Sequence, residues 1–231
     1  MENCPNAETP DNVRSNLAEQ LISALPSYLS PENKTRLFAD LMDQFPDSTN
    51  PNKVYLDLES SNLFQGDCLI DIPFHFILPE TGVTTHYCDG IILSNSCDCS
   101  QENITVESKN IVFSKIYVLK DYLNLLRSYP EITDEKIKTF LVNLKSNKIS
   151  NLFFLPELNK SPSLIFPESF VRFDETSFLP SSIISKYNYN YKSTTEFGDR
   201  LFSLSQYGFY LLVYKLSLHF CRFREGIERY S

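Results

Sequence analysis

Two short clusters of metal-binding and nucleophilic side chains stand out near the middle of the chain. The first is His86-Tyr87-Cys88 and the second is Cys97-Asp98-Cys99. If a hairpin brought them together, one imidazole and three thiolates could converge, which is the ligand set of a closed structural zinc site. The His-x-Cys and Cys-x-Cys spacings are tighter than those of common zinc knuckles, and free cysteines are often simply buried. We therefore expect no cofactor, with zinc held by His86, Cys88, Cys97 and Cys99 as the alternative.

The same region suggests a thiol-dependent enzyme centred on Cys97. A reactive cysteine needs a cation, a metal or a helix N-terminus that lowers its pKa, and a base within hydrogen-bond reach. His86 is a candidate base, and Asp98 or Asp67 could orient it. This hypothesis requires all of these side chains to meet.

The run Ser94-Asn95-Ser96-Cys97-Asp98 also has a purely structural interpretation. An Asp that follows a strand can close a turn by accepting backbone N–H bonds. The run would then be a tight, hydrogen-bonded corner that lines a cleft. In an extended strand, Cys97 and Cys99 would point to the same face. This interpretation explains the small polar residues without catalysis.

Basic side chains gather in one predicted helix, although the chain as a whole is acidic. The net charge is −8 and the sequence pI is near 5.0, which disfavours broad, non-specific binding to nucleic acid. A local basic rim for an oligonucleotide is still compatible with this balance, and a solvated helix face is the alternative. The candidate nucleic-acid-binding residues are Lys136, Lys138, Lys145 and Lys148, together with Arg127 and Arg172.

The N-terminal part of the chain is predicted to be helical. Residues 1–12 are polar and indicate a flexible tail, and residues 13–46 indicate a helical hairpin. Its second helix should begin at Ser30 as the N-cap, with Pro31 at the first helical position. The run from Asp47 to Lys53 is rich in turn formers and indicates a linker.

Residues 54–231 indicate one α+β domain. Strand-like alternation begins at Gln65, a long loop follows through Pro79 and Gly82, and further strands are expected at 87–93 and 110–119. A helical insertion over 121–150 contains a helix with Thr133 as its N-cap. Strands return at 152–155 and 163–173, and a long helix over 206–224 ends the chain.

The segments GDCLIDIPF (Gly66 to Phe74) and DGIILSNSCD (Asp89 to Asp98) resemble the start of the MazF/PemK toxin barrel. They are more similar to a little-characterised bacterial group of MazF-like proteins, in which a Ser-x-Ser/Thr-Cys-Asp run follows the second strand. The segment from Arg200 to Phe220 resembles the C-terminal helix of that group. The resemblance implies a small, half-open antiparallel β-barrel carrying the N-terminal hairpin, the helical insertion and the C-terminal helix.

The resemblance also implies a function, because the toxins are commonly dimeric and cleave single-stranded RNA. They use an Arg in or after the first loop as a cation for the phosphate, and a Ser or Thr from a later strand. In this chain Ser94 or Ser114 could supply the hydroxyl. No Arg or Lys occurs between Pro73 and Ile91, and Asp89-Gly90 stands where the toxins often have Arg-Pro.

Three functions are therefore expected in turn. The first is a MazF/PemK-like protein that binds, and possibly cleaves, single-stranded RNA in a toxin–antitoxin or defence system, with Ser94, Cys97, Asp98, Asp67 and His86 as candidate catalytic residues. The second is a non-catalytic module that binds a protein partner or forms a homodimer. The third is the thiol- or zinc-dependent enzyme. The polar N-terminus and the absence of a long apolar run predict a cytoplasmic protein without a membrane segment.

Overall fold

The computed structural model describes residues 19–23, 25, 29–58, 60, 62–80, 82–99, 109–161, 164–181 and 200–221. The chain divides into two compact units, Met1–Phe45 and Pro46–Ser231. The predicted tail over residues 1–12 lies outside the described residues, and so does much of the first predicted helix. Residues 19–23 of that helix are helical.

In the first unit, α2 spans Pro31–Gln44 and begins as predicted. The Ser30 hydroxyl accepts a hydrogen bond from the Asn33 backbone N–H at 3.2 Å, and a proline occupies the first turn. This cap satisfies one of the N–H groups that a helix leaves unpaired at its start. The local sequence is thus sufficient to set the beginning of this helix.

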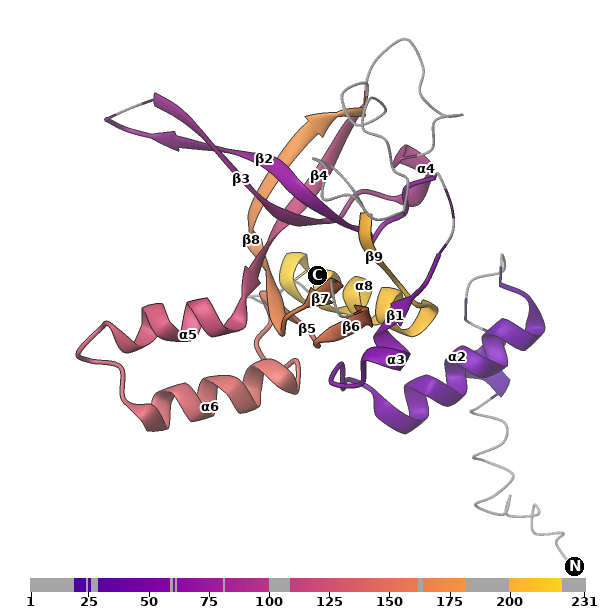
Figure 1. Cartoon of the computed structure of the whole chain (residues 1–231). Coiled ribbons are helices and arrows are strands. Elements are labelled where there is room, and N and C mark those ends of the chain that lie inside the picture. The colour runs from indigo at the N-terminus through magenta and orange to yellow at the C-terminus, as the bar shows by residue number, and fades with distance from the viewer. Residues whose placement is uncertain are drawn as a thin grey trace, which may run out of the picture. The chain divides into compact units, whose positions relative to one another are not determined.

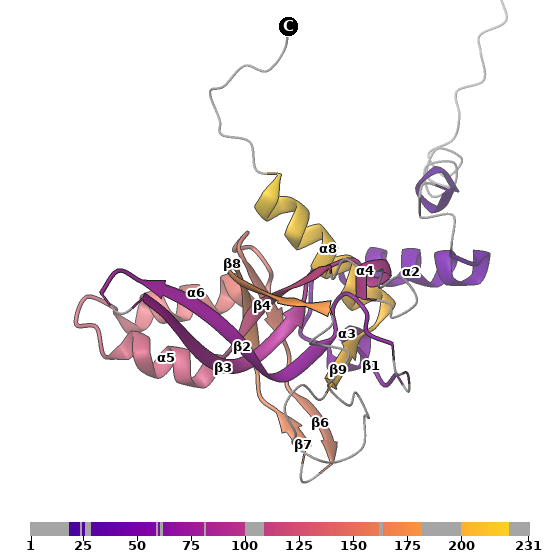
Figure 2. The same cartoon turned by 90° about the horizontal axis from the view of Figure 1, so that it is seen from above.

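The second unit is built on a seven-stranded antiparallel sheet (Figures 1 and 2). Its strand order is β1-β9-β2-β3-β4-β8-β5, and a separate two-stranded ladder joins β6 to β7. The bounds are β1 Tyr55–Leu56, β2 Cys68–Leu78, β3 Gly82–Ile92, β4 Asn110–Val118, β5 Leu152–Leu155, β6 Leu158–Ser161, β7 Leu164–Phe166, β8 Ser169–Pro180 and β9 Arg200–Leu204.

The α+β class is confirmed, and the large sheet is open rather than a closed barrel. β1 and β5 are its two edge strands, and within the described part of the chain they do not pair with each other. The MazF/PemK type of barrel remains a prediction.

The chain around Gly66 and the chain near Ser94 lie side by side, as predicted. Cys68 pairs with Ile91, and the Gly66 N–H donates to the Ile92 carbonyl at 2.9 Å. The Ile92 N–H returns a bond to the Asp67 carbonyl at 2.9 Å. These contacts make β2 and β3 neighbours at the end of the sheet that carries the predicted corner.

The long loop predicted between these strands is instead a β-hairpin. β2 continues to Leu78 and β3 begins at Gly82, so the strands pair through Leu78 and Gly82 and the hairpin projects beyond the rest of the sheet (Figure 1). Gly82 has a φ of +74°, which suits glycine at a tight reversal. The prediction failed because Pro79 and the threonines were taken as loop residues, although threonine favours strands.

Residues 47–53 are not an open linker. Asp47 closes a turn by accepting the Thr49 N–H at 2.7 Å, and the short helix α3 spans Pro51–Val54. The Ser205 N–H at the start of α8 (Gln206–Phe220) donates to the Val54 carbonyl at 2.8 Å. A Cβ atom at Gly208 would lie 2.3 Å from that carbonyl oxygen, so the close approach of α8 to α3 requires glycine there.

The helical insertion consists of α5 (Leu119–Arg127) and α6 (Asp134–Lys145), which run alongside each other (Figures 1 and 2). Thr133 is the N-cap of α6, as predicted, and accepts from the Lys136 N–H at 3.3 Å. The two helices pack on β4, β5 and β8 through a hydrophobic cluster. Its buried residues are Leu119, Leu144, Leu152, Phe154 and Phe170.

A buried lysine links α8 to the connection that follows α6. Lys215 has no exposed surface, and its ammonium donates to the Asn147 carbonyl at 2.7 Å and to the Ile149 carbonyl at 2.5 Å. Burial lowers the pKa of Lys215 to about 8. Within the described residues, no helix is long and apolar enough to cross a membrane.

Candidate functional site

The predicted corner is a hydrogen-bonded turn, but the side chains that close it differ from those expected. The Ser94 hydroxyl accepts from the Val112 N–H at 2.9 Å, and the Ser96 hydroxyl accepts from the Gln65 N–H at 3.0 Å. Asn95 Oδ1 accepts from the Cys97 N–H at 2.9 Å. Ser94, Asn95 and Ser96 therefore perform the capping that was predicted for Asp98.

The corner continues into a turn of helix, α4 (Ser96–Cys99), and not into a strand. Successive helical residues point in different directions, so Cys97 is exposed while Cys99 is buried. The prediction that both thiols share a face is therefore wrong. Burial raises the pKa of Cys99 to about 12, which makes it a poor nucleophile.

Asp98 lies at the surface of this corner. Its carboxylate forms an ion pair with Lys109 at 2.8 Å, and both side chains are nearly half exposed. An exposed pair of this kind contributes little to stability. Asp98 thus has a cationic partner, but the partner is a surface lysine and not a histidine.

Asp67 is engaged in a buried structural ion pair. Its Oδ2 accepts from the Phe64 N–H at 2.9 Å and from Arg200 Nη1 at 3.2 Å. The Arg200 guanidinium also donates to the carbonyls of Leu58, Ser60 and Asn62. Burial is the main influence on the Asp67 carboxyl and raises its pKa. Asp67 and Arg200 together hold the segment before β2 against β9.

His86 does not lie at the corner. It pairs with Phe74 on the projecting hairpin, is exposed, and contacts the Phe76 ring edge at a centroid distance of 5.5 Å. Six strand residues separate His86 from Ile92, which is about 20 Å along the chain. In the described part of the chain, no group of three or more His, Cys, Asp or Glu side chains is placed to hold a metal ion.

The predicted basic rim is divided between two environments. Lys136, Lys138 and Lys148 are exposed, and the Lys136 ammonium donates to the Glu131 carbonyl at 3.0 Å. Lys145 is half-buried and pairs with Glu168 at 2.5 Å. Arg172 lies on β8, away from α6 in the sequence, within a different polar cluster.

That cluster is created by a large bulge in β8. On β4, Ser114 pairs with Thr176 and Ile116 pairs with Val171, so Lys115 alone faces the four residues from Arg172 to Glu175. Bulges of this kind redirect side chains and are common beside functional sites. The buried Ser114 hydroxyl donates to the Arg172 carbonyl at 2.5 Å and lies 3.3 Å from the Glu175 carbonyl.

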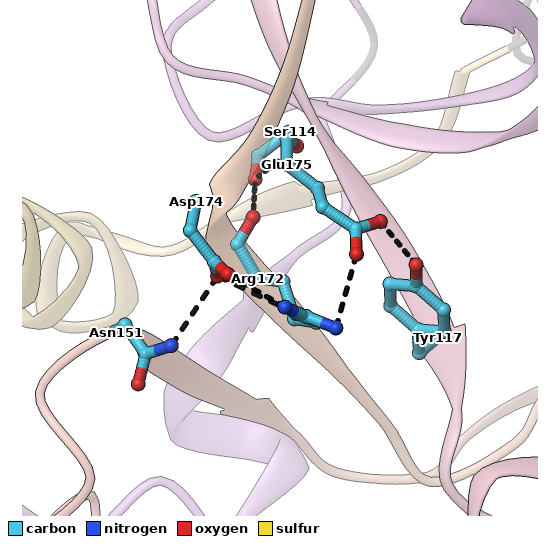
Figure 3. Close-up of polar contacts among 6 residues, drawn as sticks. All are labelled: Ser114, Tyr117, Asn151, Arg172, Asp174 and Glu175. Atoms are coloured by element: carbon cyan, nitrogen blue, oxygen red, sulfur yellow. Dashed lines mark hydrogen bonds and ion pairs between the residues drawn. The ribbon is translucent and has the colours of Figure 1, made fainter. Parts of the chain in front are cut away.

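The bulge brings together one aromatic, one basic and two acidic side chains, which we term the β8 bulge cluster: Tyr117, Arg172, Asp174 and Glu175. Arg172 pairs with Asp174 at 2.6 Å and with Glu175 at 3.0 Å. Figure 3 shows the Glu175 carboxylate between the Arg172 guanidinium and the Tyr117 hydroxyl, which donates to it. Asn151 donates to Asp174 at 3.3 Å from the other side.

A second cation adjoins the cluster. Lys115 places its ammonium 4.3 Å from the centroid of the Tyr117 ring and 6.0 Å from that of Phe76, and Arg172 Cζ lies 5.9 Å from the Tyr117 centroid. These distances permit cation–π attraction. Tyr117 also stacks on Phe170 with a centroid distance of 5.5 Å, which fixes its ring.

The protonation states in this cluster follow from its contacts. Burial and the Glu175 carboxylate raise the pKa of Tyr117, so its hydroxyl stays protonated and donates. The hydrogen bond from Arg172 lowers the pKa of Asp174. Burial raises the pKa of the nearby Cys88 thiol to about 11, and Lys115 partly opposes this shift. The cluster is therefore two cations beside two carboxylates, with a half-exposed aromatic ring between them.

Sequence reasoning singled out Arg172 for its charge alone and missed Lys115, Tyr117, Asp174 and Glu175. The alternation of FSKIY in β4 does place Lys115 and Tyr117 on one face of a strand. No local pattern, however, signals a bulge that sets four residues against one. Only the pairing of β4 with β8 shows that these side chains meet.

Comparison with protein families and with curated proteins gives no match for this chain. The fold and the cluster define its class directly. It is an α+β protein with an open antiparallel sheet that carries an aromatic and charged cluster at a strand bulge.

Proposed function

We propose that the protein is MazF/PemK-like and binds and cleaves single-stranded RNA on the β8 bulge cluster, as part of a toxin–antitoxin or defence system. The observation that carries this proposal is the Tyr117 ring flanked by Lys115 and Arg172 beside the Glu175 carboxylate. Bases stack on aromatic rings whatever their sequence, while adjacent cations contact phosphates. Lys115 and Arg172 are thus the cations that the first loop lacks.

The cluster also contains the groups that metal-free RNA cleavage requires. Glu175 would take the proton of a 2′-hydroxyl, whose oxygen then forms a bond to phosphorus. Arg172 would stabilise the charge of the phosphorane, and Lys115 would give a proton to the departing 5′-oxygen as the P–O bond breaks. The products are a 2′,3′-cyclic phosphate and a 5′-hydroxyl.

The charge balance of the cluster limits the affinity. Lys115 and Arg172 are matched by Asp174 and Glu175, so phosphate must compete with carboxylate for the guanidinium. With about two phosphate contacts, the logarithm of the binding constant should fall with a slope near −1.4 against the logarithm of salt concentration. A steep salt dependence is not expected.

Fluorescence anisotropy with a labelled, mixed-sequence single-stranded RNA tests this proposal, and gel analysis of the same samples follows cleavage. Arg172→Ala should weaken binding about tenfold, in line with loss of one charge-assisted contact. Glu175→Gln should bind at least as tightly as the wild type and fail to cleave. Asp98→Ala, at the corner, is the matched control and should behave as the wild type.

Two results would reject the proposal. If Asp98→Ala or Ser94→Ala removes binding while Arg172→Ala does not, the corner is the RNA site. If the wild-type protein neither binds nor cleaves RNA at low salt, the RNA function is wrong.

A second candidate function is recognition of a protein partner or of a second copy of the chain. Helix α8 exposes Tyr214 and Leu218, four residues apart, and Phe220 near its end, where 65% of the side chain is accessible. Large apolar side chains on one helix face are typical of helix-mediated contacts. Light scattering of the wild type and of Leu218→Asp tests this, because a partner held by α8 should dissociate in the variant.

A further inference from the structure

A separate pocket opens between the two helices of the insertion and the turn that leads into β8. It has a volume of about 380 Å³. Its apolar lining comes from Leu119, Leu123, Leu141 and Pro167. The volume lies near the lower end of the range of roughly 300–1,000 Å³ that small-molecule sites occupy. We term this cavity the α5–α6 pocket.

Charged side chains surround this apolar lining unequally. Lys120, Arg127 and Lys145 contribute cations, whereas Glu157 and Glu168 contribute carboxylates. Glu168 is already paired with Lys145 at 2.5 Å. Among the described residues, no carboxylate forms an ion pair with Lys120 or Arg127, and Arg127 contacts only the Asn124 side chain, at 3.5 Å.

Lys145 is held in place from two directions. Its ammonium pairs with Glu168 and lies 5.3 Å from the centroid of the Phe154 ring, which is buried in the core. The lysine is therefore a fixed part of the pocket wall, while Lys120 and Arg127 are exposed at the α5 side. An anion that entered would meet two cations without having to displace a carboxylate from either.

From these observations we propose that the α5–α6 pocket binds a small organic anion with an apolar body, such as a medium-chain carboxylate. The leucines and Pro167 would bury the apolar chain, and Lys120 and Arg127 would bind the charged head. This site is distinct from the β8 bulge cluster and does not depend on an RNA function. The pocket is too small for more than a short aliphatic or monocyclic body.

Two-dimensional NMR of the full-length protein tests this proposal through titration with octanoate, octanol, octylamine and acetate. Octanoate should shift the amide signals of Leu119, Leu123, Leu141 and Glu168 in a saturable way. Octanol lacks the charge, acetate lacks the chain and octylamine has the opposite charge. Each of these three should bind at least tenfold more weakly than octanoate.

Variants assign the head group to the pocket. The double substitution Lys120→Gln/Arg127→Gln should weaken octanoate binding at least tenfold and leave the spectrum otherwise native, because both side chains are exposed. Lys138→Gln removes a charge from α6 outside the pocket and should leave the affinity unchanged.

Three outcomes would overturn the proposal. Equal affinity for octanol and octanoate would mean that the cations play no part. Equal weakening by Lys138→Gln would indicate general attraction to a basic helix pair. Shifts of the same amides by single-stranded RNA, with none by octanoate, would assign the pocket to nucleic acid.

Discussion

Two regions of the second unit are rich in polar side chains, but only one leaves them available to a ligand. In the corner around Ser94, the hydroxyls and the Asn95 amide accept backbone N–H groups, so they stabilise the turn. In the β8 bulge cluster, the Ser114 hydroxyl stabilises the bulge, and the charged side chains beyond it are partly exposed. A chemically suggestive sequence run can thus be a folding device, while the functional candidates come from strands that are distant in the sequence.

The same comparison separates the two carboxylates that the sequence nominated from those that the structure adds. Asp67 is buried against Arg200, and Asp98 pairs with a surface lysine. Glu175 instead contacts both an arginine and a tyrosine hydroxyl at a half-exposed position. Each of the following predictions breaks or sharpens this contrast.

Arg200→Ala should have the largest effect on stability, because it leaves Asp67 charged and buried and removes the donor to three carbonyls. Breaking a buried pair from one side costs about 3–5 kcal/mol. Urea denaturation followed by circular dichroism measures the loss. Lys109→Ala, which breaks the exposed pair with Asp98, is the control and should cost under about 1 kcal/mol. Equal losses would mean that Asp67 has no structural role.

Ser114→Ala should destabilise the protein by about 1–3 kcal/mol, because the buried carbonyls in the bulge lose their donor. It should also weaken RNA binding, since the bulge positions Arg172 and Glu175. Denaturation and anisotropy on the same variant measure both effects. Unchanged RNA affinity, despite the expected loss of stability, would separate the bulge geometry from RNA recognition.

Ser94→Ala should cost about 1 kcal/mol, because the Val112 N–H loses its acceptor. RNA affinity should stay at the wild-type value. The same two measurements apply, and a selective loss of RNA binding in this variant would move the site to the corner.

The smallest predicted effect concerns the thiols. With pKa values of about 11 for Cys88 and about 12 for Cys99, only a small fraction of either is thiolate at pH 8. Alkylation of each should therefore accelerate about tenfold per pH unit towards its pKa. Mass spectrometry after iodoacetamide treatment measures these rates. Lys115→Met should slow the alkylation of Cys88, because the lysine favours the thiolate; an unchanged rate would place Lys115 away from Cys88.

Much of the local structure follows from the sequence, because its causes are local. The N-caps Ser30 and Thr133 and the strand over 110–119 are examples, and the contact between the Gly66 and Ser94 segments was also predicted. The hairpin, the helix α4 and the short helix α3 were missed, since their residue types are ambiguous. The β8 bulge cluster had no sequence signal, because it depends on the register of β4 against β8.

Photo-crosslinking of a single-stranded RNA that contains 4-thiouridine, followed by mass spectrometry of the crosslinked peptide, tests the central claim most directly. If the RNA lies on the β8 bulge cluster, the crosslink should map to Tyr117 and disappear in Arg172→Ala. A crosslink within residues 94–99 that survives Arg172→Ala would contradict the account.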